Sequence, residues 1–324
     1  MTTGPGPRPV RTVFLGSGGF GVESLRRLAS APEVEIVGVV TAPPRPVGRN
    51  QTLTRTRIHE AAIAAGVPVV LTPGRLRAPE AVAAVLGLRP ELLVLADYGQ
   101  IVPEDLLELR HGALNLHPSL LPRHRGATPI PAAILAGDAE TGVTLMRMDA
   151  GLDTGPIVAQ SRRRLDHAET APELGSVLSN DAANLLSSTL GPWLDGEIVP
   201  APQPADGASL TRPLRREDGR LDLTRPAAEL ERQVRAYLPW PGSFVETDLV
   251  GRLIVEDARV DDATVAAPGS GDRAGQLVAD GDGLALVTSD GRLRLGRVRA
   301  AGRKPMTAAE LRRGAPGLVG SVVR

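Results

Sequence analysis

The first half of the chain alternates short apolar runs with segments that carry apolar residues at helical spacing. Apolar runs of this length predict buried strands, and the intervening segments predict amphipathic helices. The predicted strands are 11–16, 34–41, 67–70, 92–96 and 113–116, with helices such as 22–29 and 79–86 between them. This alternation is typical of a doubly wound, mostly parallel α/β sheet of the Rossmann-like kind.

The second half has a different pattern. A long helix rich in alanine and leucine is predicted over 171–190, and the stretch 200–213 contains four prolines and little periodicity, which indicates a linker. Beyond it, short apolar runs at 253–260, 275–279, 284–288 and 293–298 are separated by Gly and Asp turns, as in a small OB-like β-barrel. We therefore predict a disordered tail at 1–9, a sheet domain at 10–199, a linker at 200–213 and a barrel domain at 214–324.

Three polar residues stand where this topology places ligand clefts. Asn115 and His117 occupy alternate positions at the carboxyl end of a predicted strand, so their side chains should face the same side. Asp153 follows the next predicted strand, 143–148, in a turn between Gly151 and Gly155. Taken singly, each residue is usually structural. Together, an amide, an imidazole and a carboxylate can stabilise an oxyanion and move protons.

A glycine-rich loop could indicate a dinucleotide site instead. The sequence from Gly16 to Gly21 follows a strand, opens a helix and fits the pattern G-x-G-x-x-G. However, the second strand ends at Thr41, where a ribose-binding acid should stand. We therefore expect no NAD. The loop remains either a tight turn or a phosphate site at a helix amino terminus.

Composition narrows the function classes. At 324 residues, with 42% hydrophobic and 23% charged residues, the chain is long enough for two domains with cores of their own. It has no cysteine, and its five histidines show no metal-ligand spacing, so a cytoplasmic protein without a metal is expected. No apolar run approaches the length of a membrane span, and the amino terminus has no signal-peptide core.

Basic residues are concentrated in two places although the net charge is zero. The stretch 45–57 contains four arginines and no acid, and the stretch 292–313 contains eight basic residues and one acid, Glu310. Arg292 and Arg294 alternate with leucines, which predicts a strand with one basic face, and Gly296 is a plausible bulge before the alternation resumes. Such a face is either a nucleic-acid contact or an ordinary solvated surface.

The text NLHPSLLPRHRGATPI, followed by MDAGLDTG, resembles the catalytic pattern of the folate-dependent formyltransferases, and the resemblance runs through most of the chain. It implies a formyltransferase fold and 10-formyltetrahydrofolate as the formyl donor. It also implies that Asn115 and His117 hold the oxyanion, while Asp153 keeps His117 charged and relays the amine proton. By the same resemblance the folate contacts are Ser119, Leu120, Leu121, Pro122, Tyr98 and Gly99.

Within that family, the chain most resembles the members that formylate the methionyl group of initiator tRNA. The RPxGR element at 45–49 resembles their basic insertion, and LRREDGRLDL, RAYLPWPGSF and GRKPM resemble their second domain, although Leu223 stands where tryptophan is common. The implied tRNA contacts are Arg45, Arg49, Arg294, Arg299, Arg303 and Lys304.

The resemblance thus implies initiator methionyl-tRNA and folate as partners and a tRNA-binding barrel domain. We expect a cytoplasmic monomer that does not bind a membrane. Two alternatives stay open. One is a formyltransferase that acts on a UDP-linked amino sugar or a glycinamide nucleotide. The other is a non-catalytic RNA-binding protein, against which the intact Asn115, His117 and Asp153 argue.

Overall fold

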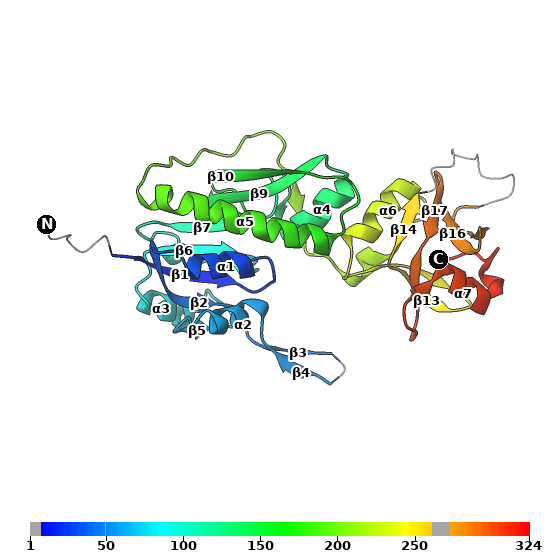
Figure 1. Cartoon of the computed structure of the whole chain (residues 1–324), viewed down its shortest axis with the longest axis horizontal. Helices are drawn as coiled ribbons and strands as arrows, with labels where there is room; N and C mark the ends of the chain where they lie inside the picture. The colour runs from blue at the N-terminus through cyan, green and yellow to red at the C-terminus, as the bar shows by residue number, and fades with distance from the viewer. Residues whose placement is uncertain (1–7, 49, 261–272) are drawn as a thin grey trace. The chain divides into compact units, whose positions relative to one another are not determined.

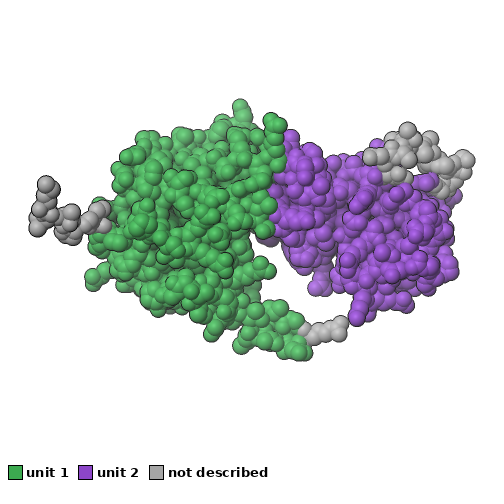
Figure 2. Space-filling model, in the orientation of Figure 1, with its two compact units in different colours: residues 1–129, 140–164, 175–212 green, residues 130–139, 165–174, 213–324 purple. Residues whose placement is uncertain are grey.

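The computed structural model describes residues 8–48, 50–260 and 273–324. The chain forms two compact units (Figure 2), the first made of 1–129, 140–164 and 175–212, and the second of 130–139, 165–174 and 213–324. The prediction of a disordered tail falls mainly on residues 1–7, which lie outside the described residues. In the described part of the chain, no helix is long and apolar enough to cross a membrane.

A seven-stranded sheet forms the centre of the first unit (Figure 1), in the order β10-β9-β7-β6-β1-β2-β5. Its first five strands in the chain pair in parallel, whereas β9 and β10 are antiparallel to their neighbours. The strands are β1 (Val10–Gly16), β2 (Val34–Val40), β5 (Val70–Leu71), β6 (Leu92–Ala96), β7 (Ala113–His117), β9 (Glu140–Arg147) and β10 (Ile157–Arg164). The predicted mostly parallel α/β sheet is confirmed.

The helices α1 and α5 lie side by side across the sheet (Figure 1), and the Ser179 hydroxyl of α5 donates to the Phe20 carbonyl just before α1 (2.8 Å). Four helices belong entirely to the first unit: α1 (Val22–Ala29), α2 (Arg57–Ala64), α3 (Pro79–Gly87) and the short 3-10 helix η1 (Glu104–Leu106). Two more are divided between the units. Most of α4 (Pro129–Ala136) and the first residues of α5 (Ala171–Leu194) group with the second unit, and the rest of α5 groups with the first.

Three short features depart from the sequence expectations. Of the strand predicted at 67–70, only Val70 lies in the observed strand β5, which continues to Leu71; Pro68 has no amide hydrogen to give to a ladder. The basic stretch folds into a hairpin of β3 (Arg45–Val47) and β4 (Thr52–Thr54) that extends from the sheet (Figure 1). The two-residue strands β8 (Arg125–Gly126) and β11 (Leu210–Thr211) pair in parallel.

The second unit contains two four-stranded antiparallel sheets, β12-β13-β18-β19 and β14-β17-β16-β15. Buried residues such as Leu253, Leu286 and Leu293 form their common core. The strands are β12 (Ser243–Thr247), β13 (Gly251–Val255), β14 (Ala258–Val260), β15 (Leu277–Asp280), β16 (Gly283–Val287), β17 (Arg292–Leu295), β18 (Arg297–Ala300) and β19 (Met306–Thr307). This confirms the small β domain.

The two sheets are joined where the chain turns a corner. The runs predicted as single strands, 253–260 and 293–298, each divide into two strands that belong to different sheets. At the corner, the Gly296 amide donates to the Asp257 carbonyl (2.9 Å), and a side chain at Gly296 would collide with the Asp257 carboxylate. The helices here are α6 (Ala227–Ala236) and α7 (Ala308–Gly314), with short 3-10 helices η2 (Arg216–Gly219) and η3 (Pro316–Leu318).

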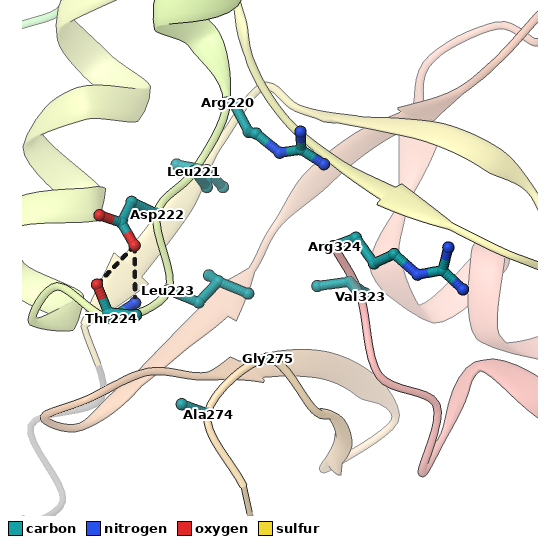
Figure 3. A pocket seen from close by; sticks show the side chains of 9 residues that line it. All are labelled: Arg220, Leu221, Asp222, Leu223, Thr224, Ala274, Gly275, Val323 and Arg324. Carbon is teal, nitrogen blue, oxygen red and sulfur yellow. Dashed lines mark hydrogen bonds between the residues drawn. The ribbon is translucent and has the colours of Figure 1, made fainter.

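An open pocket of about 490 Å³ lies in the second unit, and Leu223 contributes to its wall (Figure 3). The Asp222 carboxylate fixes the adjoining turn by accepting from the amide and the hydroxyl of Thr224 (3.1 and 2.7 Å). Gly275 lies across the pocket. A methyl group added to Gly275 would lie 3.8 Å from the Leu223 side chain. Leu223, which stands where the resemblance leads us to expect tryptophan, is one of the nine residues that line this pocket.

Candidate active site

Strand β7 ends on the two polar residues that the sequence singled out. In the sheet, Asn115 pairs with Leu95 of β6 and Met146 of β9, and His117 pairs with Thr144 of β9. As alternate residues of one strand, Asn115 and His117 face the same side. His117 is buried, whereas Asn115 is half-buried, and no group in the described residues hydrogen-bonds to the Asn115 amide side chain. That amide can therefore donate to a ligand without giving up an existing bond.

The His117 ring lies between two acceptors. Its Nε2 is 3.0 Å from the carbonyl oxygen of His124, which can only accept, so Nε2 donates. Its Nδ1 is 3.6 Å from Asp153 Oδ2. The structure thus brings Asp153 to His117, as the sequence expectation required, and an imidazole with acceptors at both nitrogens is suited to hold a proton at each.

Asp153 is held in a turn that follows β9. Its backbone has φ +51°, in the left-handed region that aspartate tolerates better than most residues. Asp149 shapes the turn by accepting from the Gly151 amide (3.0 Å) and the Thr154 hydroxyl (2.8 Å). The Asp153 Oδ2 atom accepts from the Gly126 amide (2.7 Å), so the carboxylate is fixed to the loop after His117.

Burial changes the protonation of the site. Desolvation lowers the pKa of His117 below its ordinary value of 6.5, and the carboxylate of Asp153 acts in the opposite direction. The expected effect of Asp153 on the pKa is present, but the burial of the ring outweighs it. The imidazole therefore gives up a proton more readily than an exposed histidine does.

The loop predicted to bind folate is built around Thr144 of β9. The Thr144 hydroxyl donates to the Ser119 carbonyl (2.7 Å) and accepts from the Leu121 amide (3.0 Å). Ser119 is fully buried, and its hydroxyl donates to the Arg123 carbonyl (2.6 Å), whereas Leu121 is 3% exposed. Pro122 is also buried, which leaves Leu120 as the half-buried member of the four. The three buried residues therefore shape the loop from within.

Tyr98 and Gly99, the other predicted folate contacts, differ in their surroundings. Tyr98 packs in the core of the first unit beside Val102 and Leu106, and burial raises its pKa to about 12. Its hydroxyl has no hydrogen-bond partner among the residues that the structure describes. Gly99 has φ +72° with open space around it, so its backbone can approach a ligand.

Asp97, which directly follows β6, occupies the space beside the glycine-rich loop. The amides of Ser17 and Gly18 donate to the Asp97 carbonyl (2.9 and 3.4 Å), and a side chain at Gly18 would overlap the Asp97 carboxylate. Although solvent reaches Asp97, the surrounding protein desolvates its carboxyl group and raises the pKa to about 6. Two engaged amides beside an acidic side chain do not favour a pyrophosphate, so the loop is a tight turn at these residues.

The predicted tRNA contacts differ in their pairing with acidic groups. Arg294 is ion-paired with Asp280, and Arg299 donates to Glu256 (2.8 Å). Arg45 is exposed on the β3–β4 hairpin, whereas Arg49 lies outside the described residues. Arg303 and Lys304 are exposed in the loop between β18 and β19.

Sequence reasoning missed the contribution of the proline-rich stretch. Residues 200–213, predicted as a linker, include Gln203 and Ser209, which hydrogen-bond to the Asp153 turn and to the loop after His117. An isolated glutamine between prolines carries no periodic signal, so only the folded chain identifies it. Among the described residues, no three histidine, cysteine or carboxylate side chains gather as metal ligands.

Comparisons with known proteins assign the chain to a family. The sequence profile described as formyl transferase matches residues 10–190, and the profile of the formyl transferase C-terminal domain matches residues 213–316. The chain belongs to the formyl transferase family and is a formyl-transferring enzyme.

The similar relatives carry a more specific name. The chain is 44% identical over 308 residues to a protein of Roseiflexus sp. strain RS-1, covering 94% of this chain and 93% of the relative. It is 43% identical over 313 residues to a protein of Myxococcus xanthus strain DK1622, covering 95% and 96%. Both relatives are named methionyl-tRNA formyltransferase.

Solved structures show the same fold at low identity. The N-formyltransferase of Helicobacter canadensis, in complex with folinic acid and dTDP-3-aminofucose, has a TM-score of 0.63 at 15% identity and covers 88% of this chain and 98% of its own. The sugar 3N-formyl transferase WlaRD has a TM-score of 0.64 at 14% identity and covers 92% and 100%. These likenesses support the architecture alone.

Proposed function

We propose that this enzyme transfers the formyl group of 10-formyltetrahydrofolate to the amino group of methionyl on initiator tRNA. The observation that carries the proposal is the cluster of Asn115, His117 and Asp153 at the end of β7, with the 3.6 Å approach of the imidazole to the carboxylate. The acceptor is inferred from relatives that share more than 40% of their residues over nearly the whole length.

The donor set fits a formyl group. Formyl transfer to an amine places negative charge on the formyl oxygen and requires a proton to leave the amine. The Asn115 amide, which binds no other described residue, donates to that oxygen, and His117, on the same side of β7, places its imidazole beside it. 10-Formyltetrahydrofolate supplies the formyl group when it is bound.

Asp153 moves the proton in this proposal. Its Oδ2 atom is held by the Gly126 amide (2.7 Å), so its position relative to His117 is fixed, while Oδ1 has no hydrogen bond to a described residue. Oδ1 accepts the proton that the attacking amine loses and returns it, through water, to the folate nitrogen as its bond to the formyl carbon breaks. The proton lost by the amine equals the proton gained by the leaving nitrogen, so the transfer balances.

The remaining assignments belong to the same proposal. Residues 10–199 are the catalytic domain and residues 214–324 bind tRNA through Arg303 and Lys304, with Arg45 contributing from the hairpin. Leu120 and the backbone at Gly99 contact the folate. The enzyme works as a monomer in the cytoplasm, where its tRNA substrate is found.

The test is the choice of acceptor. Purified enzyme and 10-formyltetrahydrofolate are incubated with initiator methionyl-tRNA, elongator methionyl-tRNA or an amino sugar linked to a nucleoside diphosphate. We expect formylation of the initiator at a rate well above that of the other two. Transfer to the amino sugar alone would contradict the acceptor and leave formyl transfer standing.

A further inference from the structure

The proline-rich stretch 200–213, which follows α5, runs along the candidate active site and is hydrogen-bonded to the first unit at both of its ends. At one end, Ala201 and Ile157 exchange two backbone hydrogen bonds (2.7 and 2.8 Å). At the other, β11 pairs with β8, and the Ser209 hydroxyl accepts from the His124 amide (2.8 Å). Gln203 lies between these two attachments, in the stretch that the sequence presents as a proline-rich linker.

The Gln203 side chain uses its whole amide group. Its Nε2 donates to the carbonyl oxygens of Asp153 and Gly155, both at 2.8 Å. Its Oε1 accepts from Arg125 through Nε (3.1 Å) and Nη2 (2.6 Å). Two carbonyl acceptors on one side and a guanidinium on the other leave only one orientation of the amide that satisfies every partner.

Hydrogen bonds, and not a packed core, hold the part of the turn that Gln203 contacts. Leu152 and Thr154 are exposed on either side of Asp153, whereas Gly155 is buried, so the described side chains next to Asp153 do not pack into a core. Asp153 itself has φ +51°, a conformation that persists only where surrounding contacts impose it. Side-chain hydrogen bonds to the turn's carbonyl groups supply such contacts.

Gln203 also connects the turn that contains Asp153 to the loop that contains Arg125 and Gly126. Arg125, which donates to Gln203, immediately precedes Gly126, whose amide binds the Asp153 carboxylate (2.7 Å). One side chain thus ties the backbone of Asp153 to the loop that binds its carboxylate. The position of that carboxylate relative to His117 Nδ1 depends on both attachments.

We propose that Gln203 is a positioning residue that fixes the Asp153 carboxylate against His117. The role rests on the proposed function in that Asp153 relays the amine proton, but the geometry that Gln203 imposes does not depend on which acceptor is formylated. The β8–β11 pairing and the Ser209 contact remain without Gln203, so its loss should displace the turn and leave the fold intact.

The test replaces Gln203 with methionine, which has similar length and no charge, and separately with glutamate. Glutamate keeps an acceptor for Arg125 but sets an oxygen against the carbonyl groups of Asp153 and Gly155. We expect kcat to fall about tenfold to a hundredfold in both variants, as for a displaced catalytic group. KM for folate and tRNA should change less than about twofold, since the residues that bind both substrates are unchanged. Gln276→Glu, the same change on the second unit, is the control.

A readout without substrate separates this role from a structural one. The carboxylate of Asp153 raises the pKa of His117, so its displacement in Gln203→Met should lower the pH at which the His117 ring titrates by NMR. The Tm should stay that of the unmodified enzyme. An unchanged His117 titration, or a lower Tm with lost folate binding, would overturn the positioning role. Failure to formylate tRNA in the unmodified enzyme would contradict the proposed function alone.

Discussion

At the residue scale, the properties of the site come from a few neighbours that the sequence places far away. His117 faces Asp153 across 36 positions of the chain, and the carbonyl oxygen at its other nitrogen belongs to His124. The spacing of Asn115 and His117 on one strand could be predicted, because alternation in a strand is local. The contact of Gln203 with the Asp153 turn could not, because it depends on how a segment without periodicity returns to the sheet.

Asp97 provides a pH-dependent test at this scale. Desolvation raises its pKa from 3.8 to about 6, so the folded state disfavours the charged form. A group with a raised pKa contributes most to stability below its unfolded value, and that contribution is lost as the pH rises through about 6. Asp97→Asn, which tolerates the left-handed backbone of this residue, should therefore raise the Tm at pH 8 more than at pH 4. Equal differences at the two pH values, measured by calorimetry, would contradict the assignment.

At the element scale, the hydrophobic pattern of the sequence predicts some strand boundaries and misses others. Strands β6 and β7 begin at the predicted residues because each is a continuous buried run. The run 253–260 is predicted as one strand, but the chain bends at Glu256 and Asp257 and forms two. Hydrophobic alternation does not show to which sheet each half of such a run belongs. Strands β8 and β11 are two residues long, too short for any periodic signal.

The β8–β11 pairing can be tested through Gly126. This glycine has φ +103°, and a methyl group on it would lie 2.3 Å from the Thr211 carbonyl oxygen. Gly126→Ala should destabilise the enzyme by more than about 1 kcal/mol and increase hydrogen exchange at β11, because the substitution adds a collision to backbone strain.

Gly196→Ala is the matched control for that substitution. Gly196 also has a positive φ, +74°, but nothing lies within 4 Å of the position its methyl group would take. The control should therefore show the backbone strain alone. If Gly126→Ala cost no more than Gly196→Ala in chemical denaturation, the two strands would not be closely paired in solution.

At the scale of the whole molecule, binding to tRNA has to come from local charge, since the chain carries no net charge at pH 7. The arginine-rich strands contribute less than their sequence suggests, because Arg294 and Arg299 are paired with Asp280 and Glu256. Exposed basic residues outside those pairs, such as Arg303 and Lys304, are better placed for phosphate contacts.

A salt titration distinguishes these two groups. Replacing Arg303 and Lys304 together with alanine should lower the affinity for tRNA. It should also reduce the slope of log K against log salt by about 1 for each phosphate group that the variant no longer binds. Replacing Arg294 and Arg299 should have the smaller effect on the slope, because their charges are partly balanced by neighbouring acids. A larger slope change for Arg294 and Arg299 would contradict this ranking.

The most direct test of formyl transfer at the end of β7 is the single-turnover rate with initiator methionyl-tRNA in the Asn115→Ala variant. Because the Asn115 side chain binds no described residue, its loss should leave the Tm unchanged. The rate should fall by about a hundredfold to a thousandfold, as expected for loss of an oxyanion donor. Asn180→Ala, on the exposed side of α5, should keep the full rate. A full rate with Asn115→Ala would contradict formyl transfer at this site.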